Sequence, residues 1–166
     1  KPPLNMTFTD THCHLADPKL ADTLPAVLAE AQAVGVARFI VPATSPKDWH
    51  AVAQLERPSE NIHIALGIHP WFSDGLNEAA FQQLKEELIQ HPQAWVGEIG
   101  LDFYGKEQTQ AQRNTQTDVF IRQLILAQHL NRRVIIHNLK ATAAIAAAVK
   151  TAGFTRGGIV HAFSGS

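Results

Sequence analysis

Short apolar runs alternate with longer stretches of helical periodicity along the whole chain. The runs predict six strands, at residues 6–10 continuing to His14, 38–41, 62–66, 95–99, 133–136 and 158–160. Between the runs, apolar residues recur at the spacing of three to four positions that is typical of an amphipathic helix. This order of elements predicts βα units and a parallel sheet rather than a protein built from hairpins.

Five helices are expected between the strands. A helical stripe of apolar residues runs from Leu20 to Val34. Ser45 and Pro46 are typical of an N-cap and a first helical residue, so we expect the next helix to begin there and to end near Leu55. The other three helices are expected around residues 81–88, 111–130 and 141–152.

Six strands and five helices fit either an open doubly wound sheet or part of an eight-stranded barrel. A complete barrel usually needs about 250 residues, and this chain has 166. No glycine-rich loop of the phosphate-binding kind follows a strand, so the usual signal for an open sheet is missing. We expect a single domain over residues 1–166, and we interpret residues 1–5, which precede Met6, as a tag or an upstream extension.

Composition narrows the class of protein further. Hydrophobic residues make up 45% of the chain and charged residues 17%, which is typical of a chain that folds around a core. The formal net charge of −1 argues against a broad basic surface for nucleic acid. A single cysteine cannot form an internal disulfide, and no apolar run is long enough to cross a membrane. We therefore expect a cytoplasmic protein with no membrane partner.

Two histidines stand at the end of the first predicted strand. Side chains alternate between the two faces of a strand, so His12 and His14 are expected on one face and Cys13 on the other. Two neutral imidazoles on one face are a suitable platform for a divalent metal. Cys13 is interpreted as a small residue packed against the helices.

Three further ligand-type residues each follow an apolar run: Glu98, His137 and His161. The carboxyl ends of parallel strands meet at one rim, so these residues and the two histidines of the first strand are expected in one pocket. A hydrogen-bonded histidine or a solvated glutamate explains any one of them alone. The set of five predicts a metal site.

Other residues near this rim are candidates for substrate contacts. His69 ends the third run and is expected to touch substrate rather than metal. Lys140 and Ser164 follow the last two histidines and are candidate phosphate contacts. Asp10 precedes the first histidines and is expected to orient an imidazole.

Five segments of the chain together resemble the TatD family of metal-dependent hydrolases in the amidohydrolase superfamily. They are FTDTHCHL at 8–15, GIHP at 67–70, GEIGLD at 97–102, VIIH at 134–137 and HAFSGS at 161–166. The resemblance extends from Phe8 to the last residue in the family's order. It implies a TIM-type (β/α) barrel, a dinuclear metal site and deoxyribonuclease or related phosphodiesterase activity, with DNA ends as one substrate.

The resemblance also implies a role for each candidate ligand. His12 and His14 would bind one ion, Glu98 would be shared and would also serve catalysis, and His137 with His161 would bind the second ion. Two divalent ions per complete site are implied, and imidazole with carboxylate suits Mg, Mn or Zn.

The chain departs from the family pattern at two places. Lys140 stands near the position of the family's usual arginine. The family's late aspartate, in a Glu-Thr-Asp stretch of the last barrel strand, has no counterpart in the 166 residues. We therefore expect an incomplete barrel whose chain binds metal weakly, hydrolyses little, and self-associates through open sheet edges.

Two alternatives to a nuclease stay open from the sequence. The same pocket could hydrolyse an ester or amide, such as the ester of an aminoacyl-tRNA, because metal-activated water attacks carbonyl as well as phosphoryl centres. The chain could also be a non-catalytic metal-binding fragment.

Overall fold

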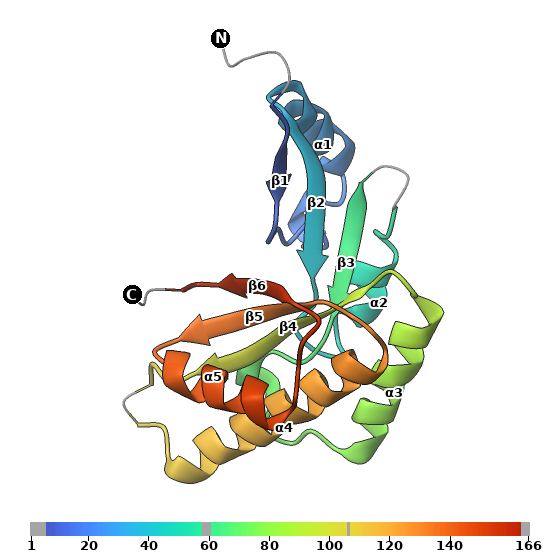
Figure 1. Ribbon diagram of the computed structural model, residues 1–166. Helices are drawn as coiled ribbons and strands as arrows, with labels where there is room; N and C mark the ends of the chain where they lie inside the picture. The colour runs from blue at the N-terminus through green and yellow to red at the C-terminus, as the bar shows by residue number, and fades with distance from the viewer. Residues whose placement is uncertain (1–5, 58–60, 106, 164–166) are drawn as a thin grey trace.

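A single curved sheet of parallel strands organises the molecule. The computed structural model describes residues 6–57, 61–105 and 107–163, and within them the six strands pair in sequence order from β1 to β6. The strands are β1 (Phe8–Asp10), β2 (Val36–Pro42), β3 (Ile62–Leu66), β4 (Trp95–Asp102), β5 (Val134–Leu139) and β6 (Gly158–His161). Figure 1 shows β1 to β3 turned steeply against β4 to β6, so the sheet forms half of a barrel.

Helices connect successive strands, as the sequence predicts. They are α1 (Leu24–Ala33), α2 (Trp49–Ala53), α3 (Glu78–Gln90), α4 (Gln110–His129) and α5 (Thr142–Thr151). The side chain of Asn77 caps α3, and Thr109 with Gln112 forms a capping box at the start of α4. The described part of the chain thus has the expected five α-helices and a wholly parallel sheet.

Apolar residues pack on both faces of the sheet. The larger cluster lies between the strands and the helices and includes Trp49, Leu84 and Phe120. A smaller cluster of Ile40, Ala65 and Ile135 lies apart from it. Alternation along a strand places His137 on the same face of β5 as Ile135.

The first strand is shorter than predicted. β1 ends at Asp10, so His12 and His14 lie in the bend that follows it and not on the strand. Asp10 Oδ1 accepts a hydrogen bond from the backbone N–H of His12 at 3.1 Å. The prediction that this carboxylate orients an imidazole is wrong, because it holds the backbone at the strand end instead.

The predicted start of the second helix is also wrong. α2 begins at Trp49, and Ser45 does not cap it. The carboxylate of Asp48 accepts backbone N–H groups of Thr44 at 2.9 Å and Ser45 at 3.0 Å, and the Thr44 hydroxyl at 2.7 Å. These bonds hold residues 44–48 in turns, so the helix forms only after them.

The boundaries of three other elements differ between the prediction and the structure. The stripe that begins at Leu20 is divided between a short 3-10 helix at Pro18–Leu20 and α1. β4 and β5 each continue beyond the predicted end, so Glu98 and His137 lie within their strands rather than at the carboxyl ends.

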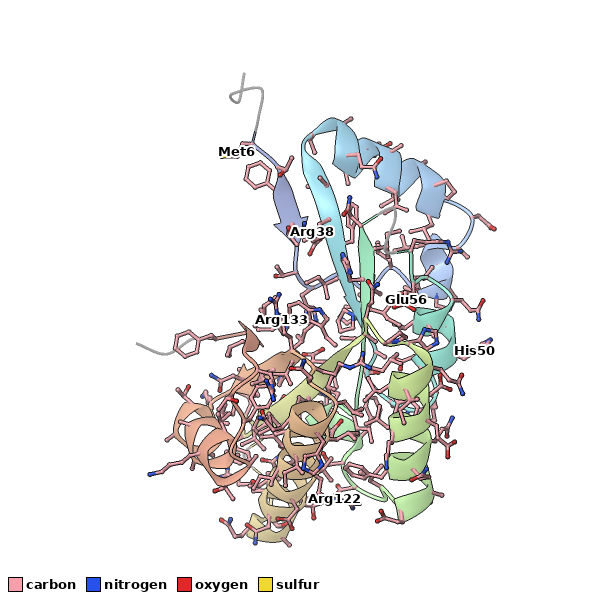
Figure 2. All side chains as sticks on the ribbon, turned by 45° about the vertical axis from the view of Figure 1, so that its right-hand side comes forward. Met6, Arg38, His50, Glu56, Arg122 and Arg133 are labelled. Atoms are coloured by element: carbon pink, nitrogen blue, oxygen red, sulfur yellow. The ribbon has the colours of Figure 1, made fainter. Side chains whose placement is uncertain are left out.

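One cavity lies on the sheet away from Glu98 and His137. Its volume is about 500 Å³, and Arg38, His63 and Arg133 are among its lining residues. Figure 2 shows both arginines on the side of the sheet opposite α1 and α3. No helix in the described residues is long and apolar enough to cross a membrane.

Candidate metal centre

Glu98 is the centre of the candidate site. It lies where the pairing of β4 with β5 is irregular, between Val96 and Ile99. Its backbone N–H donates to the carbonyl oxygen of Ala43 at 2.8 Å, which ties β4 to the segment after β2. The residue is only 3% exposed. A carboxylate at this depth requires polar partners, because an unpaired buried charge is costly.

A glycine two residues further along β4 allows the strands to approach closely. Gly100 has a φ of 138°, and a Cβ built there would lie 2.1 Å from the carbonyl oxygen of His137. Only glycine fits this position, since any side chain would push β4 from β5. The close approach places Glu98 Oε1 3.0 Å from His137 Nδ1.

Three more imidazoles surround the same carboxylate. His12 Nε2 lies 3.3 Å from Glu98 Oε2, while the Nε2 atoms of His69 and His161 lie 3.7 and 3.9 Å from Glu98 Oε1. The His12 ring stacks on His161 at 3.7 Å between centroids and meets the edge of His14 at 5.0 Å. The structure therefore brings all five sequence-predicted ligands together.

These residues line one cavity of about 320 Å³, which we call the metal pocket. Its lining residues are His12, His14, Thr44, His69, Trp71, Phe72, Glu98, His137 and His161. The potential ligand atoms form two groups, and each group lies within 4.8 Å: His12, His14 and Glu98, and His69, Glu98 and His137. Glu98 is common to both. Imidazole nitrogens with a shared carboxylate are a donor set that fits divalent metal ions.

One buried nitrogen supports this fit. His12 Nδ1 is buried and has no hydrogen-bond partner among the described residues. Most buried polar atoms in folded proteins have a partner, so His12 Nδ1 is available to bind a further group.

The histidines determine the charge of the central carboxylate. Burial raises the pKa of Glu98, but hydrogen bonds from His12 and His137 outweigh burial, and the net pKa lies well below the ordinary value of 4.5. Glu98 is therefore ionised at neutral pH, which is the form that can bind a cation.

His69 is oriented differently from the other imidazoles. Its Nδ1 accepts the backbone N–H of Trp71 at 3.1 Å, so the ring proton sits on Nε2, the nitrogen that faces Glu98. Burial lowers the pKa of His69 to about 4, despite the opposing charge of Glu98. The ring is neutral and presents an N–H donor to the pocket, an arrangement that suits contact with a substrate oxygen.

Asp102 contacts the candidate ligand His137, although the sequence interpretation did not assign Asp102 to the site. Its Oδ2 lies 3.2 Å from His137 Nε2 and accepts the indole N–H of Trp71 at 2.8 Å. Burial lowers the pKa of His137, but hydrogen bonds with Glu98 and Asp102 outweigh it and raise the net pKa. A metal-binding histidine commonly donates its second N–H to a carboxylate, and Asp102 occupies that place. The sequence signal that could have identified Asp102 is its position four residues after Glu98 on one strand, since residues an even number apart share a face.

Two buried glutamines of α4 hold the site from the helical side. Gln123 accepts the N–H of Ile68 at 2.8 Å and donates to its carbonyl oxygen at 3.1 Å, fixing the residue before His69. Gln116 accepts the N–H of Asp102 at 2.9 Å. Neither glutamine follows from a short motif, because each acts on a segment distant in sequence.

Two candidate phosphate contacts remain, Lys140 and Ser164. Lys140 is not among the lining residues of the metal pocket, and the ammonium lies 4.9 Å from the ring centre of Tyr104. Ser164 falls outside the described residues. Phosphate contacts by these two residues stay predictions.

A curved parallel sheet with histidines and a carboxylate on one side is the arrangement of metal-dependent barrel enzymes. The TatD related DNase family matches residues 9–166. YjjV of Escherichia coli K12, named a metal-dependent hydrolase, is 34% identical over 161 residues, which cover 96% of this chain and 61% of YjjV. The solved YjjV structure matches with a TM-score of 0.86 over the same shares. The chain therefore belongs to the TatD family of metal-dependent hydrolases, and its fold is that of the TIM-type barrel.

Two further relatives extend the comparison. Human TATDN3, named a deoxyribonuclease, is 30% identical over 144 residues, or 81% of this chain and 53% of that protein. A TatD family hydrolase from Entamoeba histolytica shares the fold, with a TM-score of 0.81 at 20% identity over 97% of this chain and 60% of that one. The chain thus spans about three-fifths of the length of YjjV and of the Entamoeba protein.

Proposed function

We propose that this chain carries the metal-binding residues of a phosphodiesterase that hydrolyses DNA, with two divalent ions bound around Glu98. The observation that carries the proposal is that the Glu98 carboxylate lies within ligand distance of His12 and His14 in one group and of His137 in the other. The name of the human relative as a deoxyribonuclease supports a phosphodiester of DNA as substrate.

The residues divide into ligands and supporting groups. His12 and His14 would hold one ion with Glu98, and His137 would hold the other, with His161 as its further ligand by family resemblance. When bound, a pair of divalent ions activates a water molecule and stabilises the charge that develops on the phosphoryl oxygens. Asp102 fixes the ring of His137 through the 3.2 Å contact, so that its other nitrogen faces Glu98.

The polar environment of the pocket suits an anionic substrate. Glu98 stays ionised and so favours the cations, while the neutral His69 offers its Nε2–H as a hydrogen-bond donor. A donor of this kind can orient a phosphate oxygen without adding a charge that would repel the metal ions.

Metal content of the purified chain is the first test. We would measure ions per chain by elemental analysis after mild dialysis, with Mn, Zn or Mg supplied and the intact mass checked. We expect up to two weakly held ions, retained while metal is supplied, in the wild type and in the control Glu30→Ala, an exposed position on α1. Glu98→Ala should lose them, because both ligand groups need this carboxylate. No bound ion in the wild type, or no loss in Glu98→Ala, would overturn the proposal.

A paired assay on the same samples tests the reaction. Single-stranded DNA and an aminoacyl ester are offered in parallel, each with metal and with a chelator. We expect slow, metal-dependent cleavage of the DNA, in keeping with the incomplete set of family ligands, that Glu98→Ala abolishes and Glu30→Ala retains. Turnover of the ester alone would overturn the choice of DNA.

A further inference from the structure

A second cavity adjoins the metal pocket. Its volume is about 350 Å³, and it is lined by the chain after β2 and by the segment between β3 and α3. Trp71 and Phe72 line both this cavity and the metal pocket. The two aromatic rings are therefore a wall that the cavities share, and a molecule bound at Glu98 can extend directly across it.

The tryptophan in this wall is fixed in place but open on its surface. Its indole N–H is engaged by Asp102 at 2.8 Å, and its ring meets the edge of His69 at 5.0 Å between centroids. Even so, Trp71 is 71% exposed and Phe72 is 44% exposed. Exposed aromatic rings held rigidly beside a polar site are typical of stacking surfaces for flat ligands.

The polar groups of the second cavity fit a neutral ligand. Lys47 and Asp74 are its two charged lining residues, and Ser45 and Asn77 add a hydroxyl and an amide. An anion there would meet the carboxylate of Asp74, whereas a nucleobase has a flat π-face and an edge with both donors and acceptors. The aromatic wall and the mixed polar lining together favour a nucleobase over a phosphate as the ligand of this cavity.

We propose that Trp71 and Phe72 form a nucleobase subsite for the nucleotide next to the phosphodiester held at the metal centre. This inference rests on the proposed function. The phosphate lies in the metal pocket, and the adjoining base stacks on the shared wall and directs its edge toward the second cavity. A base stacked there has left any duplex, so a single strand is the appropriate probe.

Binding without turnover tests the subsite. A short single-stranded DNA is compared with an abasic strand of the same length, in which tetrahydrofuran replaces the sugar and base of each nucleotide, with EDTA present to prevent cleavage. Affinity is measured by titration, and quenching of tryptophan fluorescence reports stacking. In the wild type we expect the strand with bases to bind roughly 5- to 150-fold more tightly, the range for stacking one base on an aromatic ring.

The variants separate stacking from folding. Trp71→Ala should remove the preference for bases and the quenching, whereas Trp71→Phe should retain most of the preference. Phe72→Ala, which leaves the bond between Trp71 and Asp102 intact, should reduce the preference. The matched control is Trp95→Phe, whose position lines the separate 500 Å³ cavity, and it should bind as the wild type does.

The outcomes distinguish this inference from the proposed function. Equal affinity for both strands, no binding of either, or an unchanged ratio in folded Trp71→Ala and Phe72→Ala would overturn the subsite. Absence of bound metal would overturn the proposed function without changing the ratio of the two affinities.

Discussion

Cys13 lies between two candidate metal ligands but is held in an unreactive state. Its Sγ donates to the carbonyl oxygen of Ile40 at 3.4 Å, and the side chain packs against the main hydrophobic core. Burial and the charge of Asp10 raise the pKa of the Cys13 thiol from 9.0 to about 12. The expected position against the core is confirmed, and a thiolate role in the site does not follow.

The raised pKa of Cys13 gives a prediction about pH. Only the thiolate attacks alkylating reagents, and a thiol with a pKa of about 12 remains protonated from pH 7 to pH 10. Iodoacetamide should therefore label the native chain slowly across this range, while the urea-unfolded chain should react faster as the pH approaches 9. Intact mass measured over time gives both rates, and equal rates in the two states would contradict the prediction.

The sequence predicted which residues lie in the candidate site wherever their position along a strand decided it. His137 and His161 follow apolar runs, and the structure places both beside Glu98. The partners of each ring were not predictable, because they depend on register. The approach at Gly100 decides that Glu98 meets Nδ1 of His137, while Asp102 meets the other nitrogen.

Helix α4 supports the site through a side chain that an apolar pattern would not select. Gln123 is fully buried and satisfies both backbone groups of Ile68. The change Gln123→Leu would leave that N–H and C=O buried without partners, at a cost of at least about 2 kcal/mol. Urea unfolding followed by tryptophan fluorescence measures the loss of stability.

The control for this prediction is the same substitution on an exposed helix surface. Gln83 lies on α3 and is exposed, so Gln83→Leu should change the free energy of unfolding by less than about 0.5 kcal/mol. If the two substitutions had equal effects, the bonds of Gln123 to Ile68 would not be important for stability.

Helices with a clear apolar periodicity were predictable from the sequence. The apolar stripe of Phe81, Leu84 and Leu88 is buried on α3, as the periodicity predicts. α2 was not predictable in the same way, because the carboxylate of Asp48 bonds the backbone of Thr44 and Ser45. Propensity favoured a cap at Ser45, and a specific side-chain contact three residues later prevented it.

The whole molecule is a half-barrel whose site depends on curvature. The candidate ligands come from the neighbouring strands β4, β5 and β6 and from the bend after β1, the strand at the opposite edge of the sheet. The sheet curves (Figure 1), and this curvature brings the side chains together around the carboxylate of Glu98. The sequence predicted a parallel sheet and a common pocket, and the family resemblance supplied the barrel. The curvature itself arises from strand twist and packing, which no local pattern contains.

The two outer strands give a prediction about assembly. Within the described residues β1 pairs only with β2 and β6 only with β5, and Phe8 and Val160 on these strands are 48% and 46% exposed. An unpaired strand edge with apolar side chains is a template for pairing with another chain. We expect the 166-residue polypeptide to associate with increasing concentration, as measured by size-exclusion chromatography with light scattering.

Two lysine variants test whether the strand edges cause the association. Val160→Lys should shift the polypeptide toward monomer, because an edge lysine opposes strand pairing. The control Val34→Lys, at an exposed position after α1, should not. A wild type that stays monomeric at high concentration would contradict association through these edges.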